Sequence, residues 1–383
     1  MRLRARCLRS RSPATQCQMQ DAKLNLTPQA KDEILVHTAL RGFAAVLVVL
    51  YHCALAHRDA DLGLATGLIR NGYVFVDVFF ILSGFILMRQ YRDAFSRSPL
   101  PSTASFMLKR FIRIYPAYLV WLVVSILVWL VLQAREPQVG TGDLSTGMAL
   151  LAHVFMIQSI LDISPKFNVP LWSIAVEFIA YLYLPLLVLA ARARRSLPLA
   201  LAICALIAGV WLFVRTMGSI DVIEGGGSVL RALLGFSLGG LACLLTLREP
   251  QATRRLGRAV DLAALAVMVV AFASGLTLVG YVAAVVLVAA TSLNTGLLTP
   301  FAALTVPRWI GLTSFSIYLS HVPILALMLI ITAKVEADFG WPLFSNYWIF
   351  SALVLATCLA VASLSYRVIE VRFRRALSAR LAR

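Results

Sequence analysis

Long apolar runs separated by short polar segments dominate the pattern along the chain. A membrane-spanning helix needs about 20 consecutive apolar residues, with about 17 as the lower limit. Eleven runs come near that length, at 36–56, 72–88, 114–133, 146–161, 171–191, 197–215, 228–247, 259–275, 278–293, 310–332 and 347–366. The pattern predicts an all-α integral membrane protein.

Clusters of basic residues between these runs predict which runs cross the membrane. They lie at 2–11, 89–113, 192–195, 248–258 and 367–383. Because cytoplasmic loops carry an excess of Lys and Arg, each cluster is expected on the cytoplasmic side. All clusters fall on the cytoplasmic side only if the short run 146–161, which contains polar residues, does not cross the membrane and is a re-entrant or outward-lying helix. We therefore predict ten transmembrane helices with cytoplasmic N- and C-termini.

Composition supports a membrane protein, and the distribution of charge argues against nucleic-acid binding. Of 383 residues, 60% are hydrophobic and 14% are charged, whereas soluble domains carry about 25% charged residues. The formal charge of +17 would also suit nucleic-acid binding. The positive charges lie between apolar runs, however, so we expect membrane lipids as partners and no nucleic acid.

The predicted domain organisation is simple. Residues 1–33 form a basic cytoplasmic arm without an apolar segment long enough for a signal peptide, or the true start is Met19. Residues 34–373 form the membrane domain, and 374–383 form a basic cytoplasmic tail. The six cysteines show no metal-ligand spacing, so no metal site is predicted.

Ionisable residues within the apolar runs are the candidates for chemistry, because each costs about 2.5–3.5 kcal/mol at a helix centre. Arg41 and His52 lie on the first run, roughly 16 Å apart along a helix axis. Asp77, Glu177 and His321 lie on three further runs. We expect His52, Asp77 and Glu177 at one depth, as a general base with carboxylates that orient it.

Each of these residues also has a structural interpretation. His52 would hydrogen-bond between helices, Asp77 would serve helix packing, and Glu177 would pair with an arginine. His321 precedes Pro323 by two residues, and it would then satisfy backbone groups that the proline frees.

Five segments resemble the membrane acyltransferase 3 family in order and spacing. They are 39–52, with Arg41 and His52 separated by ten residues; 72–85, with Asp77 and Ser83; 109–116, with Arg110 and Arg113; 171–177, with Trp172, Ser173 and Glu177; and 314–321, with Tyr318 and His321. Two positions depart from the family pattern. Phe178 replaces a frequent second acidic residue, and Glu370-Val-Arg372 stands where Glu-x-Pro is usual.

The resemblance implies a bacterial inner-membrane enzyme. Such an O-acyltransferase moves an acyl group, usually acetyl from acetyl-CoA, to a hydroxyl of an extracytoplasmic glycan or glycolipid such as exopolysaccharide or O-antigen. It also implies that Arg41 and His52 are required. Acyl-CoA is expected as a co-substrate, with no permanently bound cofactor. Arg41, Arg110 and Arg113 are candidates for its phosphates, which guanidinium groups bind in a bidentate manner.

Several alternatives remain open at the level of sequence. His52 acts as a general base or is itself acylated, with Glu177 and Asp77 as further catalytic candidates. Tyr51 and Ser83 are candidate oxyanion donors, unless 83–85 serve only close helix packing. Trp172, Ser173, Tyr318 and His321 complete the candidate site. A multi-span transporter, a non-catalytic scaffold and an acyltransferase for a small soluble molecule are the competing functions.

Overall fold

The computed structural model describes residues 33–135, 146–163, 167–191 and 196–381, and every regular element within them is helical. The long helices are α2 (Leu35–Ala56), α4 (Phe75–Arg97), α5 (Pro99–Arg135), α7 (Leu171–Ala190), α8 (Ser196–Met217), α9 (Gly225–Arg248), α10 (Pro250–Ala273), α13 (Thr305–Phe339) and α14 (Tyr347–Ser365). The shorter ones are α3 (Thr66–Arg70), α6 (Thr146–Val154), α11 (Thr277–Ala290), α12 (Leu298–Ala302) and α15 (Arg374–Leu381). Two 3₁₀ turns, Gly63–Ala65 and Gly72–Val74, flank α3, and a π-helical segment, Tyr366–Phe373, precedes α15.

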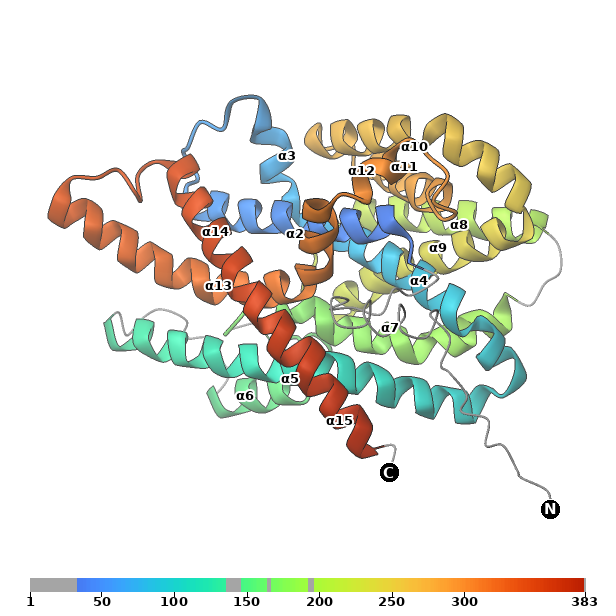
Figure 1. Ribbon diagram of the computed structural model, residues 1–383, viewed down its shortest axis with the longest axis horizontal. Coiled ribbons are helices and arrows are strands. Elements are labelled where there is room, and N and C mark those ends of the chain that lie inside the picture. Colours follow the sequence, from blue (N-terminus) through green and yellow to red (C-terminus); the bar gives the residue numbers. More distant parts are fainter. Residues whose placement is uncertain (1–32, 136–145, 164–166, 192–195, 382–383) are drawn as a thin grey trace, which may run out of the picture. The chain divides into compact units, whose positions relative to one another are not determined.

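Nine helices of the described chain are long and apolar enough to cross a membrane. Most of the long helices run side by side in Figure 1. The all-α, multi-span prediction is therefore confirmed. The predicted non-crossing run at 146–161 forms α6, which has 9 residues. A helix of that length measures about 14 Å, far less than the ~30 Å of a bilayer core, so this run does not cross as a helix.

The predicted span at 278–293, the eighth of the ten, forms the shorter helix α11, which has 14 residues. Its two ends nevertheless lie at opposite ends of α4. Asn71, before α4, donates a hydrogen bond to Phe272 O just before α11 (2.9 Å), and Arg89, late in α4, donates to Ser292 O just after it (3.1 Å). The pair α10–α11 thus runs out and back, as the predicted alternation requires.

The charges separate between the two ends of the bundle. At one end, here called the basic end, α4 finishes and α5 begins around the cluster at 89–113. At the other, here called the acidic end, α2 finishes and α9 begins, next to Asp59, Asp61, Asp221 and Glu224. This separation favours a cytoplasmic basic end, although the orientation in the membrane stays a prediction. The arm at 1–32 with Met19, and the basic cluster at 192–195, lie outside the described residues.

Glycines allow the closest helix crossings. A Cβ atom on Gly84 of α4 would lie 1.9 Å from Phe236 O, and one on Gly239 of α9 would lie 1.9 Å from Ile81 O. Small residues at such crossings let helix backbones approach within membranes. The packing role expected for 83–85 is therefore confirmed for Gly84.

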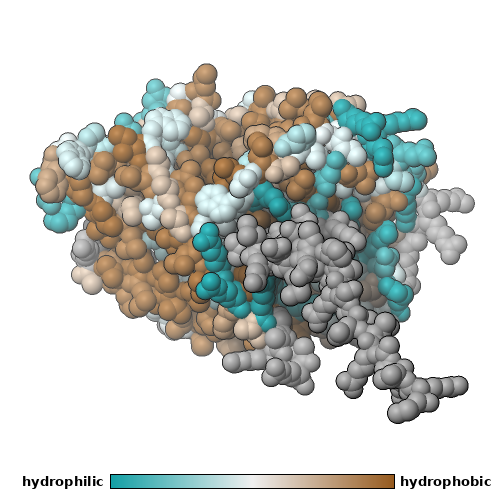
Figure 2. Space-filling model, viewed as in Figure 1, coloured by the Kyte–Doolittle hydropathy of each residue, from teal (hydrophilic) through white to brown (hydrophobic). Residues whose placement is uncertain are grey.

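Apolar side chains cover much of the molecular surface. Figure 2 shows them across the face in view, with hydrophilic side chains toward its ends. Large residues such as Leu127 on α5 (57% exposed) and Leu212 on α8 (56%) point outward. In water such a surface would aggregate, whereas in a bilayer it contacts acyl chains.

Candidate functional site

A cavity lies among α2, α4, α7 and α13. Its polar lining residues are Arg41, Ser83, Ser173, Glu177, Ser314 and Tyr318. All six belong to the segments that resemble the family, and they come from four helices that are distant in sequence. The fold therefore gathers five of the predicted candidates, Arg41, Ser83, Ser173, Glu177 and Tyr318, around one space.

Glu177 faces Ser83 and Arg41 in this cavity. The Ser83 hydroxyl donates a hydrogen bond to Glu177 Oε1 (2.6 Å), and Arg41 interacts electrostatically with the same carboxylate. Ser83 follows Asp77 by six residues on α4, or about 9 Å along the axis. Glu177 is thus at the level of Arg41, and the predicted common depth with His52 and Asp77 is wrong.

The reason is that α7 begins inside the bundle. Asn168, three residues before α7, is buried (1% exposed) and donates to Leu319 O in the middle of α13 (3.0 Å). The sequence interpretation counted residues from the membrane surface to the start of this run, and it therefore placed Glu177 too close to that surface.

Glu370 is a second buried carboxylate of the site, and the sequence interpretation missed it. Its Oε1 accepts a hydrogen bond from Ser316 on α13 (2.6 Å), and it interacts electrostatically with Arg113 and Arg41. It lies on the π-helical segment, and such segments occur frequently at functional sites. The available signal was one acidic residue within the basic C-terminal cluster.

The three arginines predicted to bind the donor have different surroundings. Arg113 lies near Arg41 and Glu370. Arg110 is buried (8% exposed), donates to the Tyr91 hydroxyl (3.0 Å) and contacts the ring of Phe106 (5.5 Å). Arg41 and Arg113 thus form the pair next to the cavity, and Arg110 lies beside aromatic rings.

His52 and His321 form a pair between α2 and α13. His321 Nε2 lies 3.3 Å from His52 Nδ1. His52 Nδ1 also faces Val48 O (2.9 Å), and His321 Nδ1 faces Tyr318 O (2.7 Å). Because a carbonyl oxygen only accepts, Nδ1 of each neutral ring carries the proton. His52 Nε2 therefore keeps a free lone pair, which a general base or a nucleophile requires.

The backbone carbonyl that Pro323 leaves free is satisfied by a residue other than His321. The carbonyl that this proline frees is that of Leu319, four residues earlier, and Leu319 O accepts from Asn168 instead. His321 faces Tyr318 O and His52. The interpretation that His321 satisfies the proline kink is wrong at this carbonyl.

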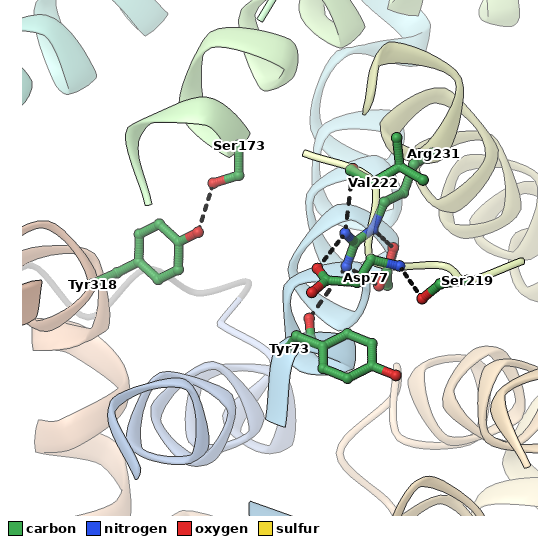
Figure 3. A network of polar contacts seen from close by, with 8 residues as sticks. Tyr73, Asp77, Ser173, Ser219, Val222, Arg231 and Tyr318 are labelled. Atoms are coloured by element: carbon green, nitrogen blue, oxygen red, sulfur yellow. Dashed lines mark hydrogen bonds and ion pairs between the residues drawn. The ribbon is translucent and has the colours of Figure 1, made fainter. Parts of the chain in front are cut away.

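Tyr318 joins the cavity to the histidine pair. Its hydroxyl and Ser173 Oγ form a hydrogen bond of 2.8 Å, which Figure 3 shows, and both residues line the cavity. Its ring centroid lies 5.7 Å from that of His321. A chain of adjacent polar groups therefore runs from Glu177 and Ser173 through Tyr318 to His52.

Asp77 lies in a separate ion-pair network, drawn in Figure 3. Arg231 on α9 donates from Nε to Asp77 Oδ1 (3.0 Å) and from Nη2 to Oδ2 (2.8 Å), with both side chains fully buried. Its Nη1 also donates to Asp221 Oδ1 (3.2 Å), and its guanidinium faces the ring of Trp172 (5.1 Å). Both Asp77 oxygens are thus engaged, which favours the packing interpretation of Asp77.

Asp221 is a carboxylate that acts on His52 through its charge. It lies in the segment between α8 and α9 and interacts electrostatically with both His52 and Tyr51. Tyr51 in turn packs edge-on against His52, with centroids 5.1 Å apart. The sequence interpretation missed Asp221 and Arg231, although Arg231 is a lone charge within an apolar run.

Of the two candidate oxyanion donors, Ser83 donates its hydroxyl to Glu177, and Tyr51 interacts electrostatically with Asp221. Within the described ranges, no three His, Cys, Asp or Glu side chains gather as a metal site would require. The chemistry available at the site is therefore that of histidine, carboxylate and guanidinium groups.

Together, the fold and this site define a multi-pass membrane protein with a polar cavity inside its helix bundle. A family model described as an acyltransferase domain matches residues 38–367. The chain belongs to this family, the membrane acyltransferase 3 family that the five segments resemble.

The chain is also similar to several curated proteins. It is 35% identical to the acyltransferase MdmB of Streptomyces mycarofaciens over 156 residues, which cover 39% of this chain and 38% of that protein. It is 25% identical to the putative peptidoglycan O-acetyltransferase YrhL of Bacillus subtilis (strain 168) over 371 residues, covering 88% of this chain and 54% of YrhL. It is 27% identical to the putative membrane-bound transacylase BcsY of Komagataeibacter xylinus over 361 residues, covering 86% of this chain and 80% of BcsY.

The matched region spans about half the length of YrhL and less than half of MdmB. No solved structure matches the chain significantly.

Proposed function

We propose that this protein is a membrane-embedded O-acyltransferase. It takes an acyl group, most simply acetyl, from acyl-CoA at the basic end of the bundle. It transfers that group to a hydroxyl of a glycan or glycolipid at the acidic end, on the outer side of the bacterial inner membrane. Family membership and the O-acetyltransferase and transacylase names of the relatives support the reaction class.

One structural observation carries the proposal. The polar groups form a series of neighbours along the bundle, from Arg41 and Glu177 through Ser173 and Tyr318 to the ring of His321 and then to His52. Buried polar groups within a membrane are costly, and a protein that served only as a scaffold would not need such a series. An acyl group that enters near Arg41 and leaves near His52 would pass each of these polar groups in turn.

The donor would bind with its phosphates at the basic end. Arg41 and Arg113 lie together there, and guanidinium groups suit phosphate oxygens. The carboxylates of Glu177, which lines the cavity, and of Glu370, which is buried, limit the repulsion between these two arginines. We expect Arg110 to support donor binding in two ways, by anchoring helix α5 to Tyr91 and by adding positive charge at the basic end.

His52 would perform the proton transfer. Its free Nε2 takes the proton of the acceptor hydroxyl while the hydroxyl oxygen attacks the thioester carbonyl carbon. The carbon–sulfur bond then breaks, and the proton passes to the departing CoA thiolate. Alternatively, Nε2 attacks the thioester itself, and the acyl group passes from an acyl-histidine to the acceptor.

Purified protein in detergent, given labelled acetyl-CoA and a panel of glycan acceptors, tests the proposal. Wild type should form labelled glycan. His52→Ala should reduce kcat by roughly 10²–10⁴, the usual contribution of an acid–base group. His57→Ala is the matched control, because His57 follows the same helix, hydrogen-bonds only to backbone carbonyls of Cys53 and Phe344, and otherwise packs against aromatic rings away from His52. An inert wild type, or equal activity of His52→Ala and His57→Ala, would contradict the proposal.

The two routes at His52 differ in one observable. Incubation with labelled acetyl-CoA in the absence of acceptor should leave a protein-bound acyl group only if His52 is acylated. Absence of that label in a protein that transfers acyl groups to glycan supports direct attack.

A further inference from the structure

A cleft at the acidic end has no role in the chemistry described above. It is lined by Tyr51, Ala54, Leu55, Arg58 and Arg70, and its volume is about 290 Å³. Two arginines side by side are unexpected here, because the segments at this end are otherwise rich in aspartate and glutamate.

Both arginines lack an acidic partner. Among the described residues, no carboxylate oxygen lies within 4.0 Å of either guanidinium, although Asp59 and Asp61 belong to the same segment. Asp61 instead accepts from the backbone N–H of Gly63 (2.9 Å). The positive charge in the cleft is therefore not neutralised within this segment.

The two arginines are held differently. Arg70 Nη2 donates to the carbonyl oxygens of Arg58 (2.6 Å) and Ala60 (3.2 Å), which fixes the loop between α2 and α3. The Arg58 side chain is exposed. The loop thus presents Arg58 on a scaffold that Arg70 stabilises.

The cleft adjoins the candidate catalytic histidine. Tyr51 forms part of its wall, and the Tyr51 ring packs edge-on against His52. Helix α2 ends at Ala56, four residues beyond His52, or about 6 Å along the axis. Asp221 lies on the Tyr51 side, so negative charge on a ligand is favoured at the arginines and disfavoured next to His52.

We propose that this cleft is the acceptor subsite and that it selects a glycan carrying an oxyanion, either a uronate carboxylate or a phosphate ester. The oxyanion binds at Arg58 and Arg70, and a neutral hydroxyl of the same glycan lies toward His52. This inference rests on the proposed function for its biological meaning, since it names the substrate class of that same site.

Equilibrium binding tests it without any acyl donor. The full chain in phosphatidylcholine nanodiscs is titrated with a β-1,4-linked glucuronate trimer, with cellotriose, and with cellotriose 6-phosphate. The first two share ring and linkage and differ at C6, where the glucuronate carries a carboxylate and the glucose a hydroxymethyl group. We expect at least tenfold tighter binding of one or both anionic trimers than of cellotriose, and which of them binds identifies the oxyanion.

Three variants test whether the preference for the anionic trimer arises at Arg58. Arg58→Gln should remove most of the preference for the anionic trimer, and Arg58→Lys should retain part of it. Arg215→Gln is the matched control, because Arg215 is an exposed arginine near the same end of the bundle that faces Trp211 and not the cleft. It should leave the preference unchanged.

Equal binding of all three trimers to wild type would overturn the inference, and so would an anionic preference that survives in Arg58→Gln. Because the measurement uses no acetyl-CoA, failure of acyl transfer alone would contradict the proposed function and leave this inference standing.

Discussion

His52 is the residue on which the proposed chemistry depends, and its neighbour His321 fixes the orientation of its ring. His321 Nε2 faces the protonated Nδ1 of His52 at 3.3 Å, so it shares that proton with Val48 O. This contact fixes the ring orientation that leaves Nε2 free. His321 touches no predicted substrate position directly and is therefore a positioning residue.

For His321→Ala we expect a fall in kcat of about tenfold, the equivalent of one hydrogen bond of roughly 1.4 kcal/mol, with KM for acetyl-CoA unchanged. The acid limb of the pH–rate profile should shift, since the environment of His52 changes. His321→Gln, which can still accept a hydrogen bond, should recover part of the rate. A rise in KM with unchanged kcat would instead place His321 at the donor.

Asp77 and Arg231 pose a different question at the residue scale, because both are fully buried and paired. Removing one partner leaves an uncompensated charge and typically costs about 3–5 kcal/mol, whereas replacing both with apolar groups is often neutral. Arg231→Met should therefore lower the thermal unfolding temperature in detergent strongly. The double variant Asp77→Leu/Arg231→Met should recover stability and keep transfer within about tenfold of wild type.

A double variant that is stable but has lost transfer completely would show that Asp77 takes part in the chemistry, as the sequence interpretation proposed. If both single variants were as stable as wild type, the ion pair would have no structural importance.

At the scale of helices, the α4–α9 crossing holds the site together. It brings Asp77 of α4 next to Arg231 of α9, and it depends on glycines with no room for a side chain. Gly239→Ala would place a methyl group 1.9 Å from Ile81 O, so the two backbones must separate.

We expect Gly239→Ala to destabilise the fold by about 1–3 kcal/mol, the usual cost of overpacking, and to reduce transfer as well. Gly226→Ala, on the same helix with no atom within 4 Å of its Cβ, should change neither. Thermal unfolding and transfer assays on the two purified variants make the comparison. Equal behaviour of both would contradict a tight crossing.

The elements themselves were largely predictable, because apolar runs long enough to span a membrane have few alternatives to helix. Basic clusters also identified 146–161 as the run that does not cross. The depth of Glu177 was not predictable, because α7 begins within the bundle at Asn168 and not at the surface. Counting residues along a run cannot reveal where that run starts relative to its neighbours.

The pairing of charges was likewise hidden in the sequence. Arg231 and Asp77 are 154 residues apart, and His52 and His321 are 269 apart. The motifs named three of these four residues, but only the packed helices show that Asp77 is tied to Arg231 and that His52 faces His321. Asp221 lies between α8 and α9, in a segment that no motif covers.

For the whole molecule, the essential feature of the proposal is that donor and acceptor approach from opposite ends. Arg41 and Arg113 lie toward the basic end, whereas His52, Asp221 and the cleft with Arg58 lie toward the acidic end. With the cavity at Arg41 as the donor entrance and the cleft at Arg58 as the acceptor entrance, the proposal predicts transfer across the bilayer, not beside it.

A sided transfer assay tests this most directly. Labelled acetyl-CoA is supplied outside sealed vesicles that contain the protein, with the glycan acceptor either enclosed in the lumen or added outside. We expect labelled glycan only when the acceptor is enclosed, and none with His52→Ala. Labelled glycan formed equally well with both substrates outside would contradict transfer across the membrane and place both entrances on one face.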